Sequence, residues 1–343
     1  MTDYPLDIIL PVWNSPVEVR SALASFSTDT PNSRLVIVNN GSDRETERIL
    51  DEFAEALDDR AILISTERNI GTVAALNLGL GKSTAPFSLV ATPFTRLAPG
   101  WFDTVLSLFN RYPESGAVVL REKNGSGRSA EFEADSASFV SMVLKKSLYD
   151  VSGGFDEGMD GGEWALRDFV RRATRSGYTT YSLQMDSLKL SAIAEFGSAA
   201  RRQEREQSAR RLYVERWGEP HSYLIVCPDS LFGANNAEFQ ETLLESARQG
   251  NRISVIAENR IGRLLSREGF SALHENITLE TLPKLFSSRA LKRILSRFAE
   301  SQPTAILVSE NDSFSAPFSR MIFSDLVSDT CRRRQGSLGR RVI

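Results

Sequence analysis

Residues 89–101 read LVATPFTRLAPGW and close the pattern that decides the fold of the first half of this chain. They begin inside the last of four short apolar runs with the length of buried strands, at 7–12, 34–38, 61–65 and 87–91. Apolar residues at helical spacing separate these runs, at 17–26, 45–57 and 72–80. Strands that alternate with helices predict a mostly parallel sheet covered by helices on both faces.

The turn after the fourth strand has an unusual composition for a ligand-binding edge. Ligands of such sheets bind outside the carboxyl ends of the strands, so this turn and those after the first three strands mark the expected site. Between Glu67 and Asp103 the chain has no acidic residue. Magnesium and manganese need hard oxygen ligands, and the hydroxyls of Thr92 and Thr95 are poor substitutes for carboxylates. This turn is therefore not expected to hold a metal.

Several short motifs follow one another along residues 6–178. They are Pro11-Val12-Trp13-Asn14, Val38-Asn39-Asn40-Gly41-Ser42, Asn69-Ile70-Gly71 with Ala74, Asn77 and Gly79-Leu80, Thr95 with Pro99-Gly100-Trp101, and residues 138–157, which end in GGFDE. In this order and with these separations, the motifs resemble those of the family-2 inverting glycosyltransferases, enzymes with the GT-A fold. The resemblance implies a nucleotide diphosphate sugar as donor and a glycan or protein hydroxyl as acceptor.

The resemblance also implies which residues contact the nucleotide sugar. In the family, the first acid of the second motif commonly contacts the base; Asn39 replaces it here and offers a different pattern of donors and acceptors. The implied binding residues are Pro11, Trp13, Asn14, Asn39, Asn40, Asn69, Gly71, Asn77, Thr92 and Arg96. Structural roles stay open, because Asn40-Gly41 is a common turn pair and Gly71 suits a left-handed helix entrance.

The family's chemistry needs a cation at the leaving group. A divalent ion, magnesium or manganese, usually neutralises the departing diphosphate. Phe94 stands where the family has its metal-binding aspartate, which leaves the metal without its usual ligand. An arginine could act instead as a fixed cation, and Arg68, Arg96 and Arg121 are candidates. Arg96 could equally be a solvated turn residue.

The family also needs a carboxylate that removes the proton from the acceptor hydroxyl. The family usually shows a GED motif after GGFDE, and GEW at 162–164 keeps two of its three letters. Counting back from Gly177-Tyr178 points instead to Asp168, which lies five residues from Glu163 and so on another face of a straight helix. Glu163 is the favoured catalytic residue, with Asp160 and Asp168 behind it.

A second alternating pattern predicts another domain. Residues 187–219 carry charges of both signs on an expected exposed helix, and the glycine and proline of 217–220 end that helix. The strands expected after it are 223–227, 252–257 and 304–309, with a short one at 271–274. We therefore expect a GT-A domain at 1–220, a Rossmann-like α/β domain at 221–332 without a GxGxxG fingerprint, and a disordered basic tail at 333–343.

Composition limits the remaining classes. The net charge of −3 argues against nucleic acid as the main partner. Two cysteines predict no disulfide framework and favour the cytoplasm, and no apolar run approaches the roughly 20 residues of a membrane span. Two functions stay open: a glycosyltransferase, which could work without metal, and a catalytically degenerate GT-A domain that binds a sugar nucleotide or glycan or scaffolds an assembly. Homo-oligomer formation is left open as well.

Overall fold

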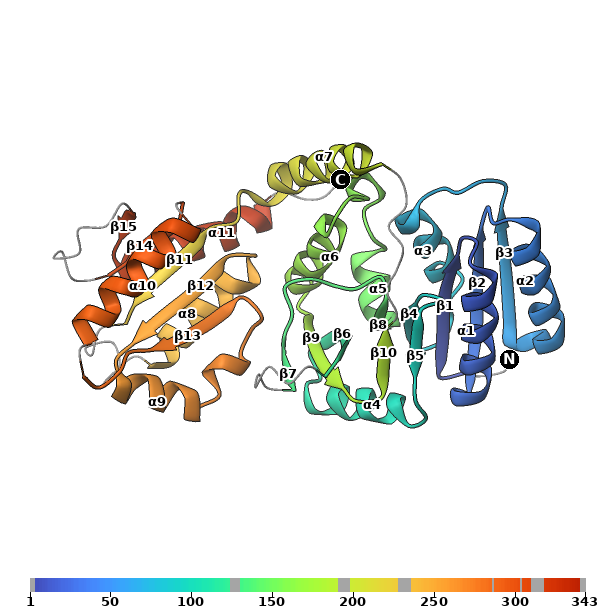
Figure 1. Cartoon of the computed structure of the whole chain (residues 1–343), viewed down its shortest axis with the longest axis horizontal. Coiled ribbons are helices and arrows are strands. Elements are labelled where there is room, and N and C mark those ends of the chain that lie inside the picture. Colours follow the sequence, from blue (N-terminus) through green and yellow to red (C-terminus); the bar gives the residue numbers. More distant parts are fainter. Residues whose placement is uncertain are drawn as a thin grey trace. The chain divides into compact units, whose positions relative to one another are not determined.

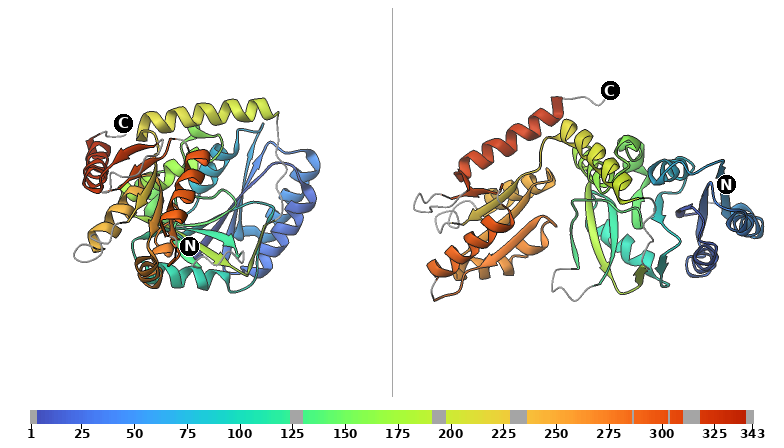
Figure 2. Two further views of the ribbon diagram at one scale, coloured as in Figure 1. Left: turned by 60° about the vertical axis from the view of Figure 1, so that its left-hand side comes forward. Right: turned by 45° about the horizontal axis from the view of Figure 1, so that its top comes forward.

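The chain forms two compact α/β units that divide between Arg216 and Trp217, four residues before the expected boundary (Figure 1, Figure 2). The computed structural model describes residues 4–123, 130–190, 198–227, 236–285, 287–302, 304–309 and 318–339. Among these residues, no helix is both long and apolar enough to cross a membrane.

The first unit is built on an eight-stranded sheet of order β3-β2-β1-β4-β8-β6-β9-β7. Its strands are β1 (Leu6–Val12), β2 (Ser33–Asn40), β3 (Ala61–Thr66), β4 (Phe87–Ala91), β6 (Ser115–Glu122), β7 (Glu131–Glu133), β8 (Ser141–Lys145) and β9 (Thr179–Met185). The first four strands are parallel, as predicted, and β8 runs antiparallel to both β4 and β6. A separate ribbon pairs β5 (Thr95–Leu97) with β10 (Leu188–Leu190).

Helices cover both faces of this sheet. They are α1 (Pro16–Asp29), α2 (Arg44–Leu57), α3 (Thr72–Leu80), α4 (Trp101–Arg111), α5 (Lys146–Ser152), α6 (Trp164–Arg175) and α7 (Ala199–Trp217). The period of two in β1 sends Ile8 and Leu10 into the core under α1, α2 and α4. Ile9 points to the opposite face, where Gly79 lets α3 approach the strand closely. The strand order therefore leaves the carboxyl ends of β1, β2 and β4 and the start of α3 at one edge.

The second unit has a five-stranded sheet of order β13-β12-β11-β14-β15 in which every pair is parallel. Its strands are β11 (Ser222–Val226), β12 (Arg252–Ala257), β13 (Ile277–Thr281), β14 (Ile306–Val308) and β15 (Ser319–Met321). Its helices are α8 (Asn236–Arg248), α9 (Asn259–Arg267), α10 (Ser287–Ser301) and α11 (Phe323–Gly339). This strand order is that of a doubly wound Rossmann sheet.

The second unit differs from the sequence predictions in one short strand and in its C-terminal tail. The short strand expected at 271–274 is replaced by a turn of 3₁₀ helix, Phe270–Ala272. The tail expected to be disordered from residue 333 is helical through Gly339, because α11 continues and Arg333 pairs with Asp329 one turn earlier, at 3.0 Å. The turn without the glycine fingerprint, residues 228–235, lies outside the described residues.

Candidate functional site

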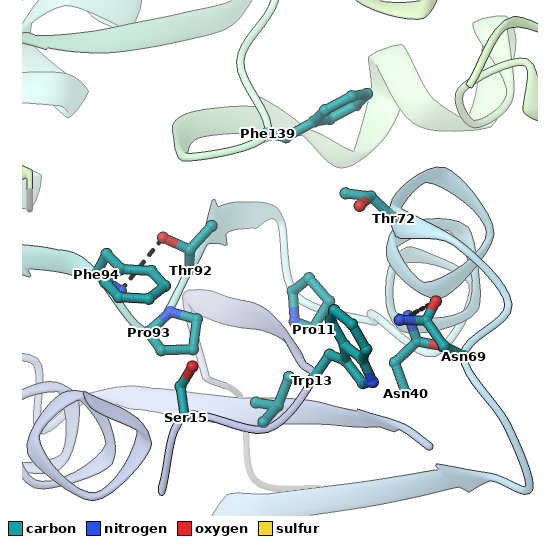
Figure 3. Close-up of a pocket in the computed structure, with 11 residues that line it drawn as sticks. Pro11, Trp13, Ser15, Asn40, Asn69, Thr72, Thr92, Pro93, Phe94 and Phe139 are labelled. Carbon is teal, nitrogen blue, oxygen red and sulfur yellow. Dashed lines mark hydrogen bonds between the residues drawn. The ribbon is translucent and has the colours of Figure 1, made fainter. Parts of the chain in front are cut away.

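A pocket of about 170 Å³ opens at the carboxyl ends of the parallel strands, the edge at which the sequence predicts the site (Figure 3). It lies after β1, β2 and β4 and beside the start of α3. Its lining consists of Pro11, Val12, Trp13, Ser15, Asn40, Asn69, Thr72, Thr92, Pro93, Phe94 and Phe139. None of these side chains carries a charge. Five of the ten predicted binding residues belong to the lining: Pro11, Trp13, Asn40, Asn69 and Thr92.

The backbone after β1 is strained where it forms the pocket wall. Asn14 and Ser15 have φ of 57° and 64°, in the left-handed region that non-glycine residues rarely adopt. Hydrogen bonds hold this conformation: Asn14 N donates to Ser42 Oγ at 3.0 Å, and Asn14 Oδ1 accepts from Asp43 N at 2.8 Å. The predicted site residue Asn14 is thus a brace outside the lining. The turn it holds presents Trp13, which is 36% exposed, to the pocket.

The paired asparagines at the end of β2 have different positions. The Asn40 amide is fixed across the pocket floor, with Oδ1 accepting from Ile70 N at 2.9 Å and Nδ2 donating to Gly71 O at 3.2 Å and Asn69 Oδ1 at 3.3 Å. Asn39 is only 3% exposed, and its Oδ1 accepts from Ser42 N at 3.0 Å. Because neighbouring strand residues face opposite ways, Asn40 lines the pocket and Asn39 does not.

The turn between β4 and β5 closes on itself. Thr92 N donates to Thr95 Oγ1 at 3.1 Å, and Phe94 N donates to Thr92 Oγ1 at 3.3 Å. Thr95 Oγ1 donates to Val140 O at 2.6 Å and so ties the turn to the segment before β8. This link brings Phe139 to the same pocket as Phe94. Phe139 was missed as a site residue, although it lies in the GGFDE-containing segment.

The Arg96 guanidinium is held by backbone carbonyls, two of them in its own turn. Its guanidinium donates to Pro93 O at 2.7 Å, Thr95 O at 2.9 Å and Glu18 O at 3.4 Å. Burial lowers the pKa of Arg96, and the nearby Glu18 carboxylate partly opposes that shift. Arg96 is therefore a half-buried cation built into the turn, not one of the lining residues and not a solvated turn residue.

Asn77 and Gly71 also lie outside the lining. Asn77 bonds both backbone groups of Phe155, accepting from its N at 2.9 Å and donating to its O at 2.8 Å. It therefore fastens α3 to the GGFDE segment. Gly71 has a φ of 98°, and a Cβ there would lie 2.7 Å from Asp160 Oδ2, so glycine is required for the close approach.

The three candidate acids differ in what holds them. Asp160 accepts hydrogen bonds from the first backbone amides of α3; its burial raises the pKa, and nearby Arg205 opposes the rise. The Glu163 side chain is 52% exposed and pairs with Arg167 at 3.1 Å. Arg167 also contacts Asp135 at 3.0 Å, so this pair bridges α6 to the segment that carries Phe139.

Asp168 is buried between two arginines. Its side chain has no exposed surface, and its two oxygens bind Arg172 at 2.7 Å and Arg216 at 2.8 Å. Arg216 also binds Asp156 at 2.6 Å, so the cluster fixes α7 to α6 and to the GGFDE segment. Asp168, a catalytic candidate from the sequence, is thus part of an ion-pair network.

The residues of the pocket do not fit a divalent cation. No lining residue is an acid, and the Thr92 hydroxyl is already used within its turn. Across the described parts of the chain, no group of three or more histidine, cysteine, aspartate or glutamate side chains could hold a metal ion. Such an ion requires several oxygen ligands, usually including a carboxylate.

Comparisons with known proteins agree with the geometry. Residues 7–172 match the model of glycosyl transferase family 2. The chain is 26% identical over 149 residues to the glycosyltransferase AglE of Haloferax volcanii, covering 42% of this chain and 47% of AglE. The chain thus spans about half the length of this curated relative.

Two solved structures share the fold at low identity. One is the mannosyltransferase PcManGT of Pyrobaculum calidifontis in complex with GDP-Man and Mn²⁺, with a TM-score of 0.50, 16% identity, and coverage of 87% of this chain and 81% of that one. The other is GalNAc-T7 with UDP, GalNAc and Mn²⁺, with a TM-score of 0.50, 11% identity, and coverage of 62% and 48%. Both comparisons bear on the fold alone.

Proposed function

Because the first unit is a family-2-like glycosyltransferase domain with the GT-A fold, we propose that its pocket binds a nucleotide diphosphate sugar and that the protein transfers the sugar to a hydroxyl acceptor. The position of the pocket is the main support for this proposal. It joins an aromatic side chain at the end of β1 to amides at the ends of β2 and β3, on the edge where such sheets bind ligands.

Different residues of the lining contact different parts of the donor. Trp13 offers an exposed ring on which the nucleotide base stacks. Asn40 holds the loop of residues 69–71 in place, and the exposed Asn69 amide in that loop is a hydrogen-bond donor for the ligand. The nucleotides named in the two structural relatives, GDP-Man and UDP, support this donor class.

Glu163 is the best placed of the three acids to act as the base. It is the only one of them with a half-exposed side chain, and Arg167 orients it at the start of α6. In the proposed step the acceptor oxygen bonds to the anomeric carbon as the bond from that carbon to the diphosphate breaks. Glu163 takes the acceptor proton, and the nucleoside diphosphate leaves.

The test combines calorimetry with a transfer assay. Titration with UDP, GDP and dTDP sugars should show binding of one donor, and Glu163→Gln should lower turnover about 100-fold or more while donor affinity changes less than about twofold. Glu157→Gln is the matched control, because this exposed acid also precedes α6 and accepts a hydrogen bond from Asn77 at 3.1 Å. Unchanged turnover in Glu163→Gln would remove Glu163 from the mechanism.

The second candidate is a binding domain without catalysis. It is favoured by the burial of Asp168 between two arginines and by the absence of acids from the lining. Donor binding with neither hydrolysis nor transfer, for every acceptor class tried, would support this candidate. Turnover that depends on Glu163 would exclude it.

A further inference from the structure

In the turn of residues 92–96, both threonine hydroxyls and the carbonyls of Pro93 and Thr95 already take part in hydrogen bonds. The Thr92 hydroxyl accepts from Phe94 N and contacts Thr95 Oγ1 at 3.2 Å. The carbonyls of Pro93 and Thr95 accept from the Arg96 guanidinium at 2.7 and 2.9 Å. Thr95 itself is fully buried and bonded to Val140 O. A cation at these oxygens would therefore compete with the hydrogen bonds of the turn, and the turn has no carboxylate to bind the ion.

The positive charge of Arg96 also disfavours the binding of a metal cation at this turn. Its guanidinium sits against the turn that carries Phe94, and a guanidinium stays charged throughout the working pH range. A divalent ion beside it would meet this positive charge, which the Glu18 carboxylate offsets only in part, and no carboxylate of the pocket lining could bind the ion. On the pocket side, the rings of Phe94 and Phe139 and the ring of Pro93 present apolar surface instead of oxygen ligands.

We propose that this site binds its nucleotide donor without a divalent cation, and that Arg96 supplies the positive charge at the turn in place of the metal. The proposal rests on the proposed donor class. The donor's rings are held by Trp13 and the apolar end of the pocket, and the phosphates lie in the field of the Arg96 guanidinium. Phe94, which stands where the family has its metal-binding aspartate, is then part of a site that binds its donor without the ion.

The first test measures the metal directly. Titration of the protein with Mn²⁺ alone, followed by electron paramagnetic resonance of the free ion, should show no stoichiometric binding. Calorimetry with the nucleoside diphosphate should give affinities that agree within about twofold in millimolar Mn²⁺ and in EDTA. Stoichiometric Mn²⁺ binding at the pocket, abolished by Thr92→Val, would overturn the proposal, as would an affinity that rises tenfold with the ion.

The second test separates the charge of Arg96 from its structural role. Arg96→Gln keeps hydrogen-bond donors for Pro93 O and Thr95 O but removes the charge. It should weaken binding of the nucleoside diphosphate about tenfold, leave binding of the uncharged nucleoside within about twofold, and flatten the salt dependence of diphosphate binding. Equal weakening of both ligands would mean that Arg96 only shapes the turn, and would overturn its assigned role. Arg48→Gln, a change at an exposed arginine of α2 that pairs with Glu52, is the control and should leave the binding of both ligands unchanged.

The two proposals can fail separately. If no nucleotide binds in either Mn²⁺ or EDTA, the proposed donor class is wrong, and the resonance titration still decides whether the turn holds a metal. A gain-of-ligand variant adds a positive test: Phe94→Asp should create measurable Mn²⁺ binding or lower the donor affinity in EDTA, whereas Phe94→Leu, which keeps the wall apolar, should do neither. Identical behaviour of the two variants would count against a role of Phe94 in excluding the ion.

Discussion

Trp13 is the residue on which donor affinity should depend most. It is the exposed aromatic ring of the pocket, and the strained residues Asn14 and Ser15 fix the turn that presents it. Stacking of a base on an aromatic side chain contributes about 1–3 kcal/mol by alanine substitution. Trp13→Ala should therefore weaken nucleotide binding by about tenfold in calorimetry, whereas Trp13→Phe should recover most of the loss. Equal affinities of all three proteins would place the base elsewhere.

Asp7 shows how one buried carboxylate stabilises the first unit. Burial by itself would raise the pKa of Asp7, but hydrogen bonds from Arg34, from the Ser83 hydroxyl and from the backbone amides of residues 84 and 85 outweigh it and lower the pKa below 3.8. The charge is therefore matched by an arginine whose side chain is only 16% exposed. Removing one partner of such a buried pair costs about 3–5 kcal/mol.

Asp7→Asn should accordingly lower the free energy of unfolding by about 3–5 kcal/mol near neutral pH, measured by urea denaturation. Since the folded pKa is the lower one, the stabilisation is complete above 3.8 and is lost as the pH falls through the folded value. The difference in the free energy of unfolding between the wild-type protein and Asp7→Asn should therefore become smaller in strongly acidic buffer. Asp150→Asn removes a half-exposed partner of Lys146 and should change stability by no more than about 1 kcal/mol. A pH-independent gap would contradict the ion-pair explanation.

At the scale of elements, the approach of α3 to β1 sets the position of the pocket floor. A Cβ on Gly79 would lie 2.5 Å from Ile9 Cγ2 and 3.2 Å from Val38 Cγ2, so the helix would have to shift. Gly79→Ala should destabilise the protein by about 1–3 kcal/mol, despite the better helix propensity of alanine, because overpacking outweighs it. Thermal unfolding measures the loss, and Leu78→Ala on the exposed side of the same helix is the control. Stabilisation by Gly79→Ala would show that this contact is loose.

Contacts between elements also give two of the predicted site residues a structural role. The spacing of Glu163 and Asp168 correctly separates them on α6, but it does not show that Asp168 turns toward Arg216 of α7. Likewise, Asn77 belongs to a motif implied to shape the nucleotide pocket, and its amide instead fastens α3 to Phe155. Both residues hold the elements that frame the pocket.

At the scale of the whole molecule, the two units should be separable in their functions. Every lining residue lies between Pro11 and Phe139, and α7, which carries Arg216, ends at Trp217. A protein cut after residue 220 should therefore bind the nucleotide with an affinity within about twofold of that of the full chain. Calorimetry on the two proteins, with circular dichroism to verify folding, makes the comparison. A folded first unit that no longer binds would show that the second unit contributes to the site.

The sequence by itself determined the alternation of strands and helices, the mostly parallel sheet, the sheet edge at which the pocket lies and the absence of an acid from the turn after β4. These properties are local: they depend on hydrophobic periodicity and on the identity of residues close together in the chain. The resemblance of the ordered motifs to family-2 glycosyltransferases is confirmed by the match of residues 7–172 to that family's model.

Only the tertiary structure decided which of the predicted residues reach the pocket. Asn40 rather than Asn39 lines it, Arg96 donates to the Glu18 carbonyl of α1, and Phe139 joins the wall through the bond from Thr95 to Val140. Such choices are made by contacts between residues far apart in the chain, 45 for Thr95 and Val140 and 48 for Asp168 and Arg216. No local pattern encodes those contacts, because the direction of a polar side chain depends on which partner satisfies it in the folded protein.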